Sequence, residues 1–230
     1  MKKSSRCFLF SALLLLLFVL FTVAVKTVDV QPIGPNGSSV GFAAVNVAMF
    51  SLFGESEFWY RLTGILGYLA ILIMVGFAAL GAWELVKRRS LKKVDADLIS
   101  LGVLLVLTLV CYALFEVLKI NFRPVLTDGE LEASYPSSHT MFVLVAMCAC
   151  AHELTCRRVR MPLRALGYTA AGAVMALTSL GRLFSGAHWL TDVLGAILLS
   201  AALVFFYRGF ERRLIGRRNR EHKRRAKAER

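Results

Sequence analysis

A histidine and an aspartate lie four residues apart at the start of a long apolar run. The stretch reads SGAHWLTD (185–192) and is followed by VLGAILLSAALVFFY, which carries no charged residue. A carboxylate about one turn inside a membrane span is costly without a partner and usually functional. The i, i+4 spacing predicts that His188 and Asp192 share one helix face. A carboxylate that accepts from one imidazole nitrogen leaves the other free to attack, so the pair predicts an oriented nucleophile.

Two earlier polar stretches carry further groups of this kind. LKINFRPVLTDG follows one apolar run, and YPSSHT opens the next. Each has a simpler interpretation: the basic residues could be interfacial anchors, the serines a helix N-cap, and the histidine a hydrogen-bonded interface residue. In chain order, the candidate residues are Lys119, Arg123, Ser137, Ser138, His139, Arg182, His188 and Asp192.

Six apolar segments could position these groups, because a bilayer crossing needs roughly 20 residues. Hydrophobic residues make up 57% of the 230-residue chain and charged residues only 19%, below the ~25% typical of soluble domains. We therefore expect an all-α integral membrane bundle with six transmembrane helices. A short apolar stretch, VGFAAVNVAMFSLFG, is too short to cross and predicts a helix lying at the interface. The six spans are expected at about 7–25, 60–85, 98–118, 138–154, 163–181 and 188–207.

Basic residues predict the orientation of the bundle. All but five of the 28 Lys and Arg residues fall on the side that six spans give to both termini. Positive residues concentrate on the cytoplasmic side, so both termini are expected there in a multi-pass cell-membrane protein. Residues 1–207 would form the membrane domain, with a catalytic core at about 98–207, and 208–230 a basic cytoplasmic tail that touches anionic lipid. The exceptions on the opposite side are Lys26, Arg61, Lys119, Arg123 and Arg182.

Other classes of protein and site fit the sequence less well. The net charge of +13 sits in short clusters between apolar runs, which argues against a nucleic-acid partner. The first apolar core is longer than a usual signal-peptide h-region of roughly 7–15 residues and favours an uncleaved anchor. The five cysteines show no CxxC pairing, so neither a disulfide framework nor a zinc site is expected.

Together, the three polar stretches resemble the motifs of the type 2 phosphatidic acid phosphatase superfamily, a family of membrane lipid phosphatases related to vanadium haloperoxidases. Its motifs are Lys-x6-Arg-Pro, Pro-Ser-Gly-His and Ser-Arg-x5-His-x3-Asp. Here Arg182, His188 and Asp192 keep the spacing of the third, with Gly181 in place of Ser. The second reads PSSH, with Ser138 in place of Gly. Lys119 lies three residues closer to Arg123-Pro124 than the first motif requires, a shift of one turn if both residues lie on a helix.

The resemblance implies hydrolysis of a lipid phosphate or polyprenyl or lipid diphosphate through a phosphohistidine, on the extracytoplasmic side. His188 would attack phosphorus with Asp192 holding it, and His139 would protonate the leaving oxygen. The membrane lipid itself would be the partner, with no metal or other cofactor and no obligate protein partner. The phosphate would be bound by Lys119, Arg123, Arg182, Ser137 and Ser138.

Three alternatives remain open from the residues alone. A lipid phosphotransferase could use the same histidines and differ only in its acceptor. A non-catalytic lipid-phosphate binding or transport protein could keep the pocket, although the intact His, Asp and Arg set argues against it. A haloperoxidase is expected to be soluble, so the apolar spans count against that class.

Overall fold

The computed structural model describes residues 2–127 and 129–228 and is entirely helical apart from loops and isolated β-bridges. Asp128 and residues 229–230 of the basic tail lie outside the described residues. The all-α class expected from the sequence is therefore confirmed. The helices are α1 (Lys2–Thr27), the 3-10 turn η1 (Pro35–Gly37), α2 (Ala43–Phe53), α3 (Glu57–Arg88), α4 (Ala96–Leu118), α5 (Ser138–Cys156), α6 (Met161–Phe184) and α7 (Leu190–Ala228).

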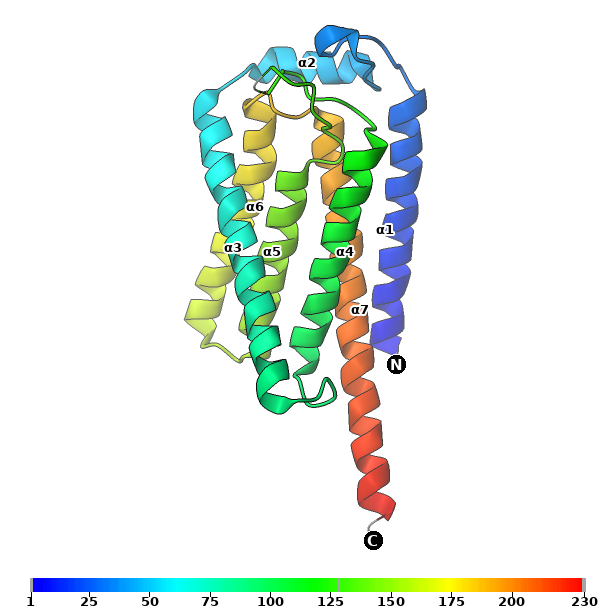
Figure 1. The fold of residues 1–230 in the computed structure, drawn as a ribbon, viewed down its shortest axis with the longest axis vertical. Coiled ribbons are helices and arrows are strands. Elements are labelled where there is room, and N and C mark those ends of the chain that lie inside the picture. The colour runs from blue at the N-terminus through cyan, green and yellow to red at the C-terminus, as the bar shows by residue number, and fades with distance from the viewer. Residues whose placement is uncertain (1, 128, 229–230) are drawn as a thin grey trace.

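Six of these helices run side by side along the long axis, and α2 lies across one end of them (Figure 1). Among the described residues, five helices are long and apolar enough to cross a membrane: α1, α3, α4, α5 and α7. The chain is thus a multi-pass membrane protein. The remaining predicted span corresponds to α6, which packs against α3 and α5; its crossing stays a prediction, so the count of six spans is approximate.

Both termini lie at the same end of the bundle, opposite α2 (Figure 1). The α3–α4 and α5–α6 connections also lie at this terminal end (Figure 1). The four basic clusters, in residues 2–6, 87–93, 157–164 and the tail after 207, therefore share it. The other end carries α2, the 119–137 loop and the 185–189 loop, and we call it the loop end. The three polar stretches thus lie at the same end of the bundle although they are far apart in the sequence.

The last helix begins later than expected. Helix α7 begins at Leu190, so His188 precedes it in a loop rather than lying in a helix. The prediction that His188 and Asp192 share a helix face is therefore wrong in detail. The same helix continues past residue 207 to Ala228, so the basic tail extends α7 without a break.

Aromatic packing and short polar contacts hold the loop end together. Tyr135 is buried, stacks on Phe18 of α1, and shares a 2.8 Å hydrogen bond with Thr22. Helix α2 is held by Asn46, whose side chain donates to Thr191 Oγ1 at 3.0 Å and accepts from Thr191 N at 3.3 Å. The loops before α5 and α7 are therefore fixed from both sides.

Candidate active site

Backbone and amide hydrogen bonds join the three polar stretches. The amide of Ser137 donates to the carbonyl oxygen of Asp192 at 3.1 Å. The indole nitrogen of Trp189 donates to the carbonyl oxygen of Phe122 at 2.8 Å. The side-chain amide of Asn121 donates to Asp192 Oδ1 at 3.5 Å. These bonds bring together most of the predicted residues around Asp192, which is fully buried at the first turn of α7.

His188 and Asp192 are neighbours in this buried region. His188 Nδ1 lies 3.6 Å from Asp192 Oδ2, just beyond hydrogen-bond length, and His188 is 3% exposed. Oδ2 instead accepts from the backbone amide of Trp189 at 3.0 Å, as a cap of the first turn of α7. The carboxylate thus flanks one ring nitrogen and leaves Nε2 facing away from it. The loop position of His188 still produces the expected neighbour relation.

Arg182 is a buried cation held by α3. Its side chain is 1% exposed, and Nη1 donates to Thr63 Oγ1 at 3.3 Å. The guanidinium lies over the ring of Tyr60 at 5.4 Å, a cation–π contact. No carboxylate of the described residues lies within ion-pair distance of it. Burial of an uncompensated charge is costly, so this arrangement favours an anionic ligand.

Gly181 explains how α3 can pack so closely against α6. A Cβ atom at this position would lie 2.6 Å from Thr63 Cγ2 and 2.9 Å from Trp59 Cε3. Real Cβ atoms do not approach other atoms so closely. The glycine in place of the motif serine therefore lets the hydroxyl of Thr63 reach Arg182.

His139 and the serines open α5. Ser137 is the N-cap, and its hydroxyl accepts from Thr140 N at 3.5 Å, so the N-cap interpretation is confirmed. Ser138 is the first residue of the helix and is half-buried. The ring of His139 packs where a side chain on Gly67 would stand, with Cδ2 only 2.6 Å from that Cβ position. Helix α3 thus sets the place of His139.

Arg123 lies at the rim of the same region. Its Nη2 pairs with Glu132 Oε2 at 3.0 Å, and its Nη1 donates to Thr127 Oγ1 at 3.2 Å. Burial and the nearby Arg182 and Arg123 charges lower the pKa of His188, and His139 adds to this shift. The two arginines and His139 are thus electrostatic neighbours of His188, which stays neutral.

Lys119 does not join this group. Helix α4 ends at Leu118, and Lys119 takes a left-handed conformation with φ 45° as its C-cap. Its side chain is exposed. The expectation that Lys119 and Arg123 share a helix face is wrong, because the residues between them form a loop. The position seven before Arg123 is Glu116, which is also exposed.

Several nitrogen atoms converge here without protein partners. Within the described part of the chain, these buried atoms have no hydrogen bond: Arg123 Nε, His139 Nδ1, Arg182 Nε, Arg182 Nη2, His188 Nδ1 and His188 Nε2. Buried polar atoms are normally satisfied. Guanidinium groups with free nitrogens can bind a phosphoryl group. An imidazole with a free nitrogen can donate a proton to it or attack it as a nucleophile.

Three contributing residues were not predicted from the sequence. Asn121 sits between Lys119 and Arg123, and a polar residue there was the one available signal. Thr63 and Tyr60 belong to an apolar run, and nothing in their spacing distinguishes them from ordinary helix residues. Their role depends on the contact between α3 and α6, which the sequence does not reveal.

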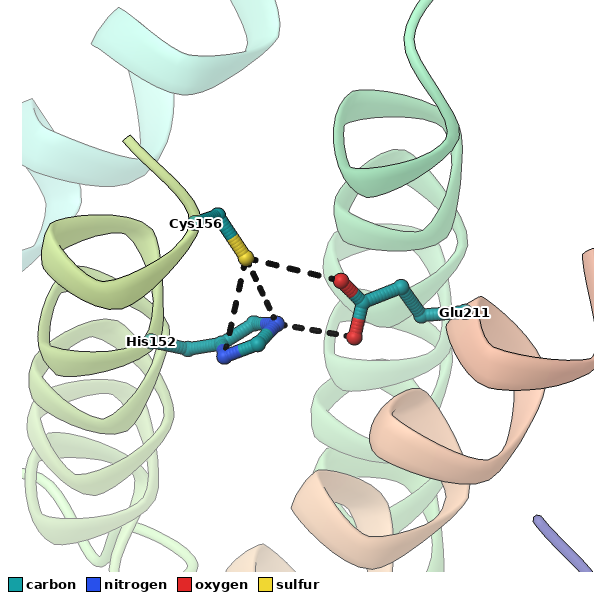
Figure 2. Close-up of side chains that lie close together, drawn as sticks. All are labelled: His152, Cys156 and Glu211. Carbon is teal, nitrogen blue, oxygen red and sulfur yellow. Dashed lines mark hydrogen bonds and ion pairs between the residues drawn. The ribbon is translucent and has the colours of Figure 1, made fainter. Parts of the chain in front are cut away.

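The structure brings together one cluster of potential metal ligands that the sequence does not reveal. His152, Cys156 and Glu211 each place one ligand atom within 4.8 Å of the others (Figure 2). The cluster was missed because Glu211 is distant in sequence and comes from another helix. All five cysteines are free thiols.

Comparison with known proteins supports the resemblance. Residues 115–215 match the family described as the PAP2 superfamily. The chain is 27% identical over 103 residues to a Bacillus subtilis (strain 168) protein named phosphatidylglycerophosphatase B, a match covering 43% of this chain and 48% of the relative. The chain therefore spans about half the length of that relative.

A solved structure shares the fold. The crystal structure of a transmembrane PAP2-type phosphatidylglycerolphosphate phosphatase from Bacillus subtilis matches with a TM-score of 0.59 and 21% identity. The match covers 88% of this chain and 96% of the other. The matched segment 115–215 contains all the polar stretches that converge at the loop end. Through that segment, the chain is similar to the PAP2 superfamily.

Proposed function

We propose that this protein hydrolyses the phosphate ester or diphosphate of a membrane lipid through a phosphohistidine. One observation carries the proposal: Arg182 is a buried cation beside two histidines, and all three side chains have buried nitrogens without a protein partner. A tetrahedral phosphoryl group offers the acceptor oxygens and negative charge that such an array would bind. The family supports the same reaction class.

In the first step, Nε2 of neutral His188 attacks phosphorus. The N–P bond forms as the bond to the lipid oxygen breaks, and His139 donates a proton to that oxygen. Asp192 lies on the Nδ1 side of His188 and stabilises the charge that develops on the ring. Arg182 and Arg123 hold the phosphoryl oxygens, with Ser137 and Ser138 at the N-terminus of α5 as further donors.

In the second step, water attacks the phosphohistidine. His139 takes a proton from the water as the N–P bond breaks, which returns His188 to its neutral form and releases phosphate. Arg123 must exchange part of its pairing with Glu132 for the substrate oxygens. Among the described residues, Lys119 makes no side-chain contact that would give it a role, and its phosphate-binding assignment stays a prediction.

A lipid is the substrate class that the surroundings favour. An apolar groove of about 910 Å³ lies between α3 and α4 and ends near Tyr112 and Phe142. Phe142 lies one helical turn after His139 on α5. An acyl or prenyl chain in this groove would bring its phosphate to the histidines. The name of the Bacillus relative makes phosphatidylglycerophosphate the first compound to test.

The basic clusters at the terminal end support an orientation in the membrane. By the positive-inside rule, this end would face the cytoplasm, and the site at the loop end would face the extracytoplasmic side. A substrate would then be taken from the outer leaflet.

The decisive experiment measures phosphate release by the purified full-length chain in detergent. The substrates are phosphatidylglycerophosphate, phosphatidic acid and a polyprenyl diphosphate. We expect release from at least one, and none from His188→Ala. Phosphate transferred to an added alcohol without release would instead indicate a phosphotransferase. Binding without turnover of any compound would contradict an enzymatic role.

Trapping tests the two histidine roles separately. A nitrophenyl phosphate needs little leaving-group protonation, so His139→Ala should still be phosphorylated by it. The second step then lacks its base, and an acid-labile, base-stable phosphohistidine should accumulate at His188. The double variant with His188→Ala is the matched control and should trap nothing. Phosphate mapped to Ser137 or Ser138, or to His139 in the wild-type chain, would show that the roles are wrong.

A further inference from the structure

A second buried polar cluster lies at the terminal end of the bundle. Figure 2 shows His152 and Cys156 on α5 facing Glu211 on α7. His152 Nε2 lies 2.8 Å from Glu211 Oε2 and 3.2 Å from Cys156 Sγ. Cys156 Sγ lies 3.6 Å from Glu211 Oε1. An imidazole, a thiol and a carboxylate thus meet at one point.

The local structure explains why these side chains meet. His152 and Cys156 are four residues apart on one face of α5, and α7 packs against that face. His152 is 7% exposed and Glu211 is 4% exposed, whereas Cys156 is exposed at the end of the helix. The cluster therefore has a buried floor and an open side through which an ion can enter.

We propose that this cluster is a zinc(II) site that joins α5 to α7. Imidazole nitrogen, thiolate sulfur and carboxylate oxygen are the three ligand types that zinc takes in proteins. Loss of the thiol proton leaves thiolate and carboxylate to balance the charge of the dication. The fourth position lies on the exposed side and takes water.

The distances between the donor atoms suit such an ion after a small adjustment. Zinc bonds of about 2.0–2.3 Å in a tetrahedron place donor atoms roughly 3.3–3.6 Å apart. The Cys156–Glu211 distance of 3.6 Å already fits. The two distances to His152 Nε2, 2.8 and 3.2 Å, must open by about half an ångström. A rotation of the imidazole side chain can supply this.

Arg208 competes with the metal. Its guanidinium donates to Nδ1 of His152. When Nε2 binds zinc, Nδ1 carries the ring proton and needs an acceptor. Arg208 must therefore move away, and its charge opposes the cation. Glutamine at this position could accept from Nδ1 without that charge.

The site is remote from the phosphate chemistry. His152 follows His139 by thirteen residues on α5, which is about 20 Å along the helix. Zinc here would stabilise the packing of α5 on α7 rather than take part in hydrolysis. The proposal does not depend on the proposed function, and its test does not measure activity.

Cobalt(II) titration of the EDTA-treated full-length chain in detergent provides the test. Cobalt replaces zinc in such sites, and a thiolate ligand produces a charge-transfer band in the near ultraviolet. We expect one equivalent to produce the band and zinc to remove it. Cys156→Ser should abolish the band, and Cys150→Ser, a thiol on the same helix outside the cluster, should retain it.

Two further variants complete the test. His152→Gln should weaken cobalt binding by more than about tenfold, and Arg208→Gln should strengthen it about tenfold. A band that persists in Cys156→Ser would overturn the proposal, as would a stoichiometry well below one. Cys156 is exposed, so its variant should fold even if the buried His152→Gln does not. Unchanged or weaker binding by Arg208→Gln would overturn the competition with Arg208.

Discussion

Gly181 and Thr63 form a matched pair between α6 and α3: the absence of a side chain on one makes room for the methyl group and hydroxyl of the other. Thr63 Oγ1 donates to the carbonyl oxygen of Trp59 at 2.7 Å and accepts from Arg182 at 3.3 Å. The hydroxyl lost from the motif position is thus replaced by one from another helix. The Thr63 hydroxyl holds the guanidinium of Arg182 in place from the α3 side.

This pairing predicts a compensating substitution. Thr63→Val should lower kcat/KM about tenfold, the effect of losing one hydrogen bond of roughly 1.5 kcal/mol to a charged group, and Thr63→Ser should retain activity. Gly181→Ser alone should clash with Thr63 and lose activity. In a double variant with Thr63→Ala, which removes the nearer clash, Gly181→Ser should recover part of the lost activity. Losses that simply add in the double variant would contradict the pairing.

Asn121 is expected to act through Asp192. Its amide donates to Oδ1 of the carboxylate, which is fully buried. Asn121→Ala should reduce kcat roughly tenfold with little change in KM, because the carboxylate is less well held while the phosphate contacts remain. Asn36→Ala, at an exposed position, is the control. A rise in KM alone would instead indicate a binding role.

Lys119 and Arg123 should differ strongly. Lys119 is exposed, so Lys119→Ala should change kcat/KM by no more than about twofold, as for an ordinary surface substitution. Arg123→Ala should lower it by about 10²–10³-fold, the usual cost of removing a group that stabilises transition-state charge. The assay is initial-rate hydrolysis of the best lipid substrate. Comparable losses would mean that Lys119 reaches the phosphate after all.

The pH dependence should reflect a depressed histidine. Burial, Arg182 and Arg123 lower the pKa of His188 below the ordinary value of about 6.5. A nucleophile with a lowered pKa stays neutral as the pH falls through that value. The acidic limb of kcat/KM assigned to His188 should therefore lie below pH ~6.5. A limb at or above that pH that persists in His139→Ala would contradict a neutral His188.

Sidedness can be tested by thiol labelling. In a variant with all five native cysteines replaced by serine, single cysteines are placed at Ser90 and Glu130. Glu130 is exposed in the 119–137 loop and follows Asp128 by two residues in the sequence. An impermeant reagent applied to intact cells should label Glu130→Cys and not Ser90→Cys. Labelling of both from the same side would reject the proposed orientation.

The sequence predicts the helices well because hydrophobic runs report directly on burial in lipid. The sequence also predicts that the histidines, Asp192 and the arginines lie close together, because alternate spans place the ends that carry these residues on one side of the membrane. It fails where contacts between helices decide the outcome. Thr63 depends on the approach of α3 to α6, and the pairing of His152 with Glu211 depends on the packing of α5 on α7. The expectation that Lys119 and Arg123 share a helix face fails for a local reason, because α4 ends one residue before Lys119.

The unbroken course of α7 limits how the basic tail can meet lipid. A 39-residue helix is about 58 Å long, whereas the hydrocarbon core is about 30 Å thick. If the helix keeps to the bundle axis, its charged C-terminal half extends away from the membrane into the aqueous phase. Counter-ions screen charges beyond about 8 Å, so roughly the first five residues past the surface attract headgroups. The turns farther out would then lie near soluble anionic molecules rather than headgroups.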